Sequence, residues 1–120
     1  MTGHVDELLR ALLDVSVRRE PSDKATSVTV WIDTAFNGHL VFSKRLIDQL
    51  GLEQEAATDA ILADGRQVTL ESYVCYVDWL ETTVSVQVIA NEGKLPLLGT
   101  ELLAGRLLQI DYAKKRVSVD

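Results

Sequence analysis

Apolar and polar residues alternate along much of the chain, in the pattern typical of half-buried β-strands. One example is the segment Leu12 to Arg18, in which every second residue is Leu or Val. A turn-forming stretch around Pro21 follows, and a second apolar segment runs from Thr26 to Asp33. The sequence therefore predicts a β-hairpin over residues 12–33. Residues 1–10 stay unassigned, because the apolar spacing in VDELLRALL also fits a short helix.

The strongest helical pattern is the segment SKRLIDQLGL. Ser43 can cap its first turn, and Leu46, Ile47 and Leu50 form one apolar stripe. Gly51 suits the position just after the last helical turn. These residues predict the main helix of the protein.

The middle of the chain is rich in β-branched and aromatic residues, which favour strands. The pair Asp64-Gly65 predicts a hairpin turn between strands at 59–63 and 67–77. A second turn is expected at residues 81–83, before the strand VSVQVIA.

The last part of the chain combines a short helix with a final hairpin. Gly99 ends a buried apolar segment, Thr100 is expected to cap a short helix over 101–104, and Gly105 is expected to end that helix. A hairpin turning at 113–115 closes the chain. The elements predict a mostly-β protein, a small closed barrel with one main helix and one short C-terminal helix.

Composition and charge restrict the class of protein. A length of 120 residues favours one domain over residues 1–120, with 1–10 an uncertain N-terminal extension. Hydrophobic residues make up 47% and charged residues 25%, an ordinary globular balance. The net charge of −6 and the lack of a Lys/Arg stripe argue against nucleic acid as a partner. No 18-residue apolar run indicates a membrane span, and no secretory signal is evident, so we expect a cytoplasmic protein.

The residues that commonly bind metals are scarce. Cys75 is the only cysteine, so an intrachain disulfide is excluded, and its apolar neighbours predict a buried, inert thiol. The two histidines, His4 and His39, have no metal-ligand spacing. We therefore expect no bound metal.

Asp33 is the most informative polar residue. It stands where the apolar strand VWI ends, in the segment VWIDTAFNGHLVFS. A carboxylate at the edge of a buried strand needs hydrogen-bond donors or an altered pKa. One interpretation is a turn acid that accepts bonds from nearby backbone N–H groups. The other is half of a catalytic pair, in which two carboxylates share one proton.

The residues around Asp33 resemble a known family. Asp33-Thr34-Ala35 after an apolar strand is similar to the Asp-Thr-Gly active-site loop of retropepsin-like aspartic proteases. Leu97-Leu98-Gly99, with a short helix behind it, resembles the apolar-apolar-Gly segment that packs beside that loop. A hairpin lies between the two motifs, where the family has its flap. The resemblance covers nearly the whole chain and is greatest to bacterial-type members encoded as a single half.

The resemblance implies an aspartic endopeptidase that acts as a homodimer on extended polypeptides, with one Asp33 from each chain. It assigns support of the active-site loop to Thr34, Ala35, Leu98 and Gly99. It assigns the substrate-covering flap to Ala63, Asp64, Gly65, Arg66 and Gln67. It implies no cofactor, and it suggests that the chain ends pair across the dimer axis. Leu40, Ile61 and Leu97 are expected at pocket walls.

One departure from the family pattern leaves an alternative function open. The third motif residue in the family is Gly, and here it is Ala35. If the loop required a positive φ at this position, Ala would be strained by about 1–2 kcal/mol. The alternative is therefore a weakly active or inactive dimer of the same fold that serves as a peptide-binding or assembly module.

Overall fold

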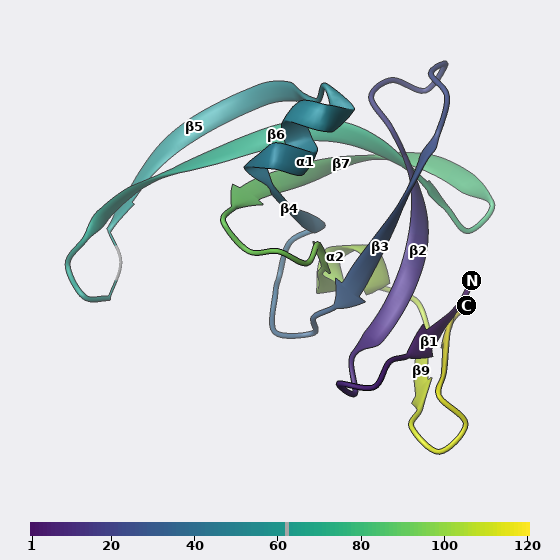
Figure 1. Ribbon diagram of the computed structural model, residues 1–120. Helices are drawn as coiled ribbons and strands as arrows, with labels where there is room; N and C mark the ends of the chain where they lie inside the picture. The colour runs from purple at the N-terminus through teal and green to yellow at the C-terminus, as the bar shows by residue number, and fades with distance from the viewer. Residues whose placement is uncertain (62) are drawn as a thin grey trace.

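Ten strands and two helices follow one another along the computed structural model, which describes residues 1–61 and 63–120 (Figure 1). In chain order they are β1 (Thr2–Val5), β2 (Ala11–Arg18), β3 (Thr26–Ile32), β4 (Leu40–Ser43), α1 (Lys44–Leu50), β5 (Glu53–Ile61), β6 (Gln67–Trp79), β7 (Thr82–Asn91), β8 (Leu97–Leu98), α2 (Thr100–Leu103), β9 (Leu108–Asp111) and β10 (Arg116–Val119). The mostly-β class with one main and one short helix is confirmed.

Six strands form a closed ring, in the order β2, β3, β8, β4, β7 and β6. The ring closes because β6 pairs with β2 as well as with β7, with Val17 opposite Val77. Most neighbouring strands are antiparallel, but β3 runs parallel to β8, and β4 runs parallel to β7. The predicted small barrel corresponds to this ring, with β5 added beside β6 and with β1, β10 and β9 added beside β2.

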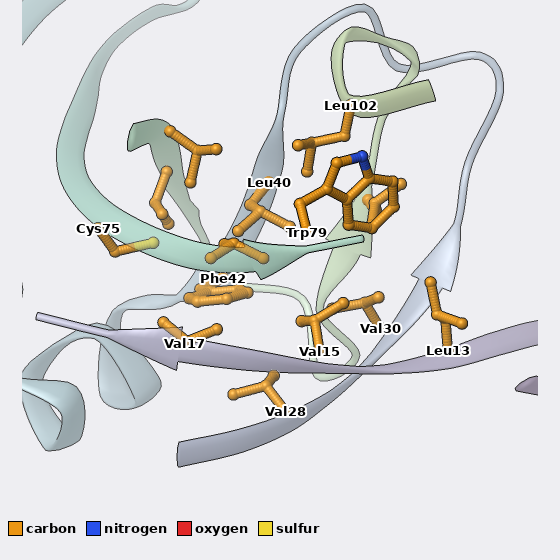
Figure 2. Close-up of a cluster of buried hydrophobic side chains, with 14 of the residues drawn as sticks. Leu13, Val15, Val17, Val28, Val30, Leu40, Phe42, Cys75, Trp79 and Leu102 are labelled. Carbon is orange, nitrogen blue, oxygen red and sulfur yellow. The ribbon is translucent and has the colours of Figure 1, made fainter. Parts of the chain in front are cut away.

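The alternating sequence pattern explains the core. From Leu13 in β2, Val28 in β3 and Tyr73 in β6, every second residue points into the ring and is buried, whereas the residues between them are more exposed. Figure 2 shows side chains of these strands converging with Leu40 and Phe42 of β4, and with Leu102 of α2, on one apolar interior. Cys75 belongs to this core and is fully buried, as predicted.

The main helix forms as its sequence predicts. Ser43 Oγ accepts a hydrogen bond from the backbone N–H of Leu46 at 3.1 Å, which caps the first turn. Gly51 adopts the left-handed conformation, with φ 66°, and ends the helix. Ile47 is buried against the barrel. The helix therefore directly follows β4 and lies against the ring (Figure 1).

Residues 1–10 form a strand and a tight turn, so the helical alternative for this segment is wrong. Asp6 decides the outcome, because its Oδ1 accepts hydrogen bonds from the backbone N–H groups of Leu8 and Arg10. The Arg10 guanidinium also binds Asp6, and its hydrogen bond lowers the pKa of that carboxyl. Such local bonds stabilise a turn in competition with a helix.

The two chain ends pair with each other within the chain. β10 lies between β1 and β9, so both of its edges are occupied. The Met1 amino group donates to Val119 O at 2.8 Å, and Val119 N donates to Met1 O at 2.9 Å. Figure 1 shows both termini side by side. Within one chain both edges of β10 are therefore occupied, and the pairing of chain ends across a dimer axis stays a prediction.

Three local predictions need correction. The turn between β6 and β7 lies at Leu80-Glu81, earlier than expected. The short helix begins at Thr100, one residue earlier than expected, so the N-cap position is Gly99, which has no side chain to cap the helix. The Thr100 hydroxyl donates to Phe36 O instead. The strand before the Asp64-Gly65 turn is β5, which begins at Glu53 and not at residue 59, and which is described up to Ile61. Ala63, which we expected in this strand, lies in the turn, and Leu62 lies outside the described residues.

Candidate active site

Asp33 begins the loop that joins β3 to β4. Its backbone N–H donates to Leu98 O at 2.9 Å, and its carbonyl accepts from Phe36 N at 3.1 Å. Its carboxylate Oδ1 accepts from the backbone N–H of Ala35 at 3.0 Å. The side chain is half-buried. Asp33 therefore accepts the backbone hydrogen bond that the turn-acid interpretation predicts. Its carboxylate also lies at the start of the loop.

The Leu97–Gly99 segment supports this loop from behind. β8 lies between β3 and β4, with Leu98 opposite both Ile32 and Leu40. Leu98 is fully buried. The two motifs, 66 residues apart (99 − 33) in the sequence, are therefore in direct contact, as the resemblance implies.

Backbone bonds also tie the far side of the loop to the start of α2. Gly99 N donates to His39 O at 2.8 Å, and Thr100 N donates to Phe36 O at 2.8 Å. Glu101 N donates to Gly38 O at 3.1 Å. These bonds satisfy the carbonyl groups of the loop, so the backbone that carries Asp33 is held at both ends.

Position 99 requires a glycine, because the Asp33 loop and the start of α2 lie so close together. A Cβ atom at this position would lie 2.3 Å from Gly38 O and 2.6 Å from Phe36 O. Both atoms belong to the backbone and cannot move without opening the loop. The position accepts only glycine, which explains why the apolar pair ends in this residue.

Thr34 and Ala35 are exposed at the tip of the turn. The non-glycine residues with positive φ in the described part of the chain are Leu9, Leu80 and Lys115. Ala35 is not among them, so its methyl group causes no left-handed strain. The replacement of the usual glycine by Ala35 therefore does not distort this loop within one chain.

Two residues that hold the loop in place could not be identified from the sequence. Phe36 accepts two bonds from Thr100 at its carbonyl, and its ring lies where a Cβ of Gly38 or Gly99 would stand. His39 Nδ1 accepts from Gln87 N at 3.1 Å, which ties the loop to β7. The glycines opposite Phe36 were the available signal, because they leave space for its ring.

The predicted flap residues form the tip of the long β5–β6 arm. Gly65 has φ 86°, and Asp64 Oδ1 accepts from Arg66 N at 3.0 Å. Arg66 Nε also pairs with Asp64 Oδ2 at 2.6 Å, so the two charges compensate each other. Figure 1 shows the arm reaching beyond the barrel, with its tip, Ala63 to Gln67, apart from the Asp33 loop. The structure does not bring these two predicted parts of the site together.

The base of the arm is anchored on the barrel. Tyr73 is buried and its hydroxyl donates to Glu71 Oε2 at 2.6 Å, which lowers the pKa of that carboxyl. Lys44 Nζ lies 3.5 Å from the same oxygen. These contacts fix the base of the arm at Glu71. Between Glu71 and the tip, the described side chains of β5 and β6 are mostly exposed.

Other candidate groups offer no second reactive centre. Burial raises the pKa of the Cys75 thiol to about 12, so the thiolate is suppressed.

Of the predicted pocket-wall residues, Leu40 is fully buried and is not a pocket wall, whereas Ile61 is exposed and Leu97 is half-buried. In residues 1–61 and 63–120, no cluster of three His, Cys, Asp or Glu side chains is arranged to hold a metal. None of the helices in this described part of the chain is long and apolar enough to span a membrane.

The chain has the fold of the retropepsin-like aspartic proteases, as its superposition on two solved structures shows. A retropepsin-like aspartic protease from Rickettsia conorii superposes with a TM-score of 0.65 at 13% identity, over 98% of this chain and 87% of that one. EIAV protease in complex with an inhibitor superposes with a TM-score of 0.57 at 15% identity, over 79% of this chain and 86% of that one. At these identities the likeness establishes the fold. The sequence matches no protein-family model and no curated protein.

Proposed function

We propose that the protein is an aspartic endopeptidase that acts as a homodimer on extended polypeptides. The observation that carries the proposal is the position of Asp33. Its half-buried carboxylate lies at the start of a loop that backbone hydrogen bonds hold at both ends, in a retropepsin fold. Preorganised groups of this kind are what acid–base catalysis requires.

Two copies are needed because one chain supplies one such carboxylate. A two-fold axis beside the loop would bring both Asp33 side chains together. Carboxylates about 3 Å apart cannot both ionise easily, so the pair holds one proton. The ionised member takes a proton from a water molecule, and the protonated member donates a hydrogen bond to the scissile carbonyl oxygen. The two carboxyls titrate as a pair and not as separate groups.

The exposed neighbours of Asp33 and the arm take supporting roles in this proposal. Thr34 is free to contact the twin loop, because its side chain is exposed in one chain. The arm tip, Ala63 to Gln67, covers a peptide that lies as an extended strand across the loop. This role requires the tip to move toward Asp33, since one chain holds them apart (Figure 1).

The alternative is a peptide-binding or assembly module that lacks catalysis. Its motivation is Ala35 and the charged tip of the arm, with Asp64 and Arg66. The absence of left-handed strain at Ala35 weakens the first of these two motivations. The same fold can serve both functions, so an activity measurement has to decide.

The deciding experiment compares cleavage of a peptide library by the wild type and by Asp33→Asn across pH 3–8. We expect acid-favoured cleavage by the wild type, because one carboxyl must stay protonated. We expect a loss of about 10²-fold or more in Asp33→Asn. Asp111→Asn is the control, since Asp111 is an exposed turn acid whose Oδ1, like that of Asp33, accepts a backbone N–H, from Lys114 at 2.9 Å. Equal cleavage by wild type and Asp33→Asn would favour the binding module.

A further inference from the structure

His39 joins two parts of the structure that meet at the end of the Asp33 loop. Its backbone carbonyl accepts a hydrogen bond from Gly99 N at 2.8 Å, on the side of α2. Its side chain accepts a hydrogen bond from another side, because its Nδ1 bonds to the backbone N–H of Gln87 in β7 at 3.1 Å. One residue therefore holds the last position of the loop between α2 and β7.

The side-chain hydrogen bond of His39 continues the pairing of β4 with β7 into the loop. In the regular ladder, Leu40 lies opposite Val88. Gln87 precedes Val88, and its N–H bonds to the imidazole of His39 in place of a backbone carbonyl. The carbonyl of His39 is engaged by Gly99 N. The histidine side chain thus extends the support of the loop by one residue beyond the start of β4.

This hydrogen bond exists only while the imidazole is neutral. A backbone N–H can only donate, so the accepting Nδ1 carries a free lone pair, and the proton of neutral His39 lies on Nε2. The imidazolium has a proton on both nitrogens and accepts no hydrogen bond. Protonation of His39 therefore places two donors face to face, and the ring has to turn away from Gln87 N. Histidine side chains ordinarily change charge between about pH 5 and 8.

Two charged residues of opposite sign line the same hollow as His39. They are Glu101 of α2 and Arg106, which follows α2. Strands β6 and β7 contribute uncharged residues to this hollow, Trp79, Val84, Ser85 and Val86. Glu101 favours the imidazolium and Arg106 opposes it. In the loop itself, the carboxylate of Asp33 is engaged by the backbone N–H of Ala35. The bond to β7 is therefore the contact of His39 that protonation removes.

We propose that His39 is a positioning residue, whose neutral imidazole holds the Asp33 loop on β7 and whose protonation releases the loop from that strand. The inference rests on the proposed function, since the loop carries the carboxylate that acts in cleavage. Catalysis needs its groups within a narrow range of positions, so a looser loop should lower the rate of cleavage. Two titrations then act in opposite directions. The shared proton of the Asp33 pair favours acid conditions, whereas the hydrogen bond of His39 favours neutral ones.

His39→Asn and His39→Leu test the proposal as a pair. Asn carries an acceptor, Oδ1, at about the place of Nδ1 and does not change charge, so it can keep the bond to Gln87 N at every pH. Leu removes the acceptor at every pH. In peptide cleavage the wild type should resemble His39→Asn at about pH 7.5 and His39→Leu at about pH 5, with a difference of about three-fold or more between the two variants at both pH values.

NMR of the isotope-labelled protein follows the same contact without any use of activity. As the pH falls from 8 to 5, the amide resonance of Gln87 should shift with the midpoint of the His39 imidazole, and its protection from hydrogen exchange should fall. In His39→Asn the Gln87 amide should stay in place over this range. His4→Gln is the control, because His4 is the other histidine of the chain and is exposed on β1. Its replacement should leave the titration of the Gln87 amide unchanged.

The possible results separate this inference from the proposed function. A Gln87 amide that does not follow the titration of His39 would overturn the inference. So would a wild type whose cleavage rate keeps a constant ratio to both variants at every pH, and the protease proposal would then stand. A Gln87 amide that follows His39, in a protein that cleaves no peptide in any of the three forms, would overturn the protease proposal and leave His39 with its contact to β7 alone.

Discussion

At the scale of single residues, the candidate site depends on close contacts between backbone atoms more than on side chains. The carbonyl groups of Phe36, Gly38 and His39 all accept bonds from the segment that begins at Gly99. This arrangement leaves room at Gly99 for a hydrogen atom but not for a methyl group. The position of Asp33 thus depends on the close approach of Gly99 to the backbone of the same loop.

Gly99→Ala tests this view. The added Cβ would meet backbone oxygens at 2.3 and 2.6 Å, so the loop must shift. We expect a loss of about 1–3 kcal/mol in the free energy of unfolding, typical of overpacking. Cleavage should fall more than stability alone explains, since Asp33 moves with the loop. Chemical denaturation and peptide cleavage provide the two measurements.

Gly93→Ala is the control for that substitution. Its Cβ would approach the exposed Asn91 side chain, at 3.1 Å, and no backbone oxygen is among its nearest atoms. A small shift of this side chain relieves the contact, at the cost at most of the exposed hydrogen bond from Gly93 N to Asn91 Oδ1. We expect a change of less than about 0.5 kcal/mol. A Gly99→Ala protein that is as stable and as active as Gly93→Ala would contradict the role assigned to the close contact.

The sequence defined single residues well where the signal was local. Ser43 and Gly51 ended the helix as expected, because a cap involves only neighbours in the chain. Thr100 was wrongly assigned as a cap, because its hydroxyl binds Phe36, a partner 64 residues away. A sequence pattern cannot include such a partner. The exposed Leu9 with its positive φ was equally beyond the reach of pattern analysis.

At the scale of elements, the closure of the ring between β2 and β6 completes the barrel. Arg18 and Asp78 bridge these two strands with bonds of 3.1 Å (Nε to Oδ1) and 2.9 Å (Nη2 to Oδ2). The hydrogen bond from Arg18 lowers the pKa of the Asp78 carboxyl. Thr83 also donates to Asp78, from the neighbouring strand β7. One carboxylate therefore links three strands at the end of the ring.

Asp78→Asn should have a pH-dependent effect on stability. Because the folded pKa of Asp78 is below its unfolded value, the stabilisation is complete above a pH of about 4 and is lost as pH falls through the folded pKa. The difference in melting temperature between wild type and Asp78→Asn should be greatest near neutral pH and should shrink below about pH 4. Thermal unfolding by circular dichroism across pH 2.5–7 measures it.

Asp48→Asn provides the comparison for this element. Asp48 pairs with Lys44 within the same helix, at 3.4 Å, and is 66% exposed. Exposed pairs of this kind contribute little, so its removal should lower the melting temperature less at neutral pH. If both variants behaved alike at every pH, the pair between β2 and β6 would have no special part in closing the ring.

Hairpins and the main helix were predictable from the sequence, whereas the closure of the sheet was not. The β2–β3, β5–β6 and β9–β10 hairpins join neighbours in the chain, and turn residues identify them. The β2–β6 and β1–β10 pairs join distant segments, and no local pattern specifies them. The contact between Asp33 and the Leu97–Gly99 segment was anticipated only through resemblance to a family.

At the scale of the whole molecule, one chain is a complete fold but half of the proposed site. The ring is closed and the chain ends are paired within the protomer. Since the proposed site needs a second chain, activity should depend on protein concentration. The central claim is that catalysis needs the Asp33 carboxyls of two chains.

Mixing wild type with Asp33→Asn at constant total concentration tests this claim most directly. Sedimentation first establishes that both proteins associate equally, and incubation allows the subunits to exchange. If two Asp33 residues are required, random pairing in an equal mixture leaves about one quarter of the wild-type cleavage rate. A rate of about one half, proportional to the wild-type fraction, would show that each chain acts with its own Asp33 and would contradict the account.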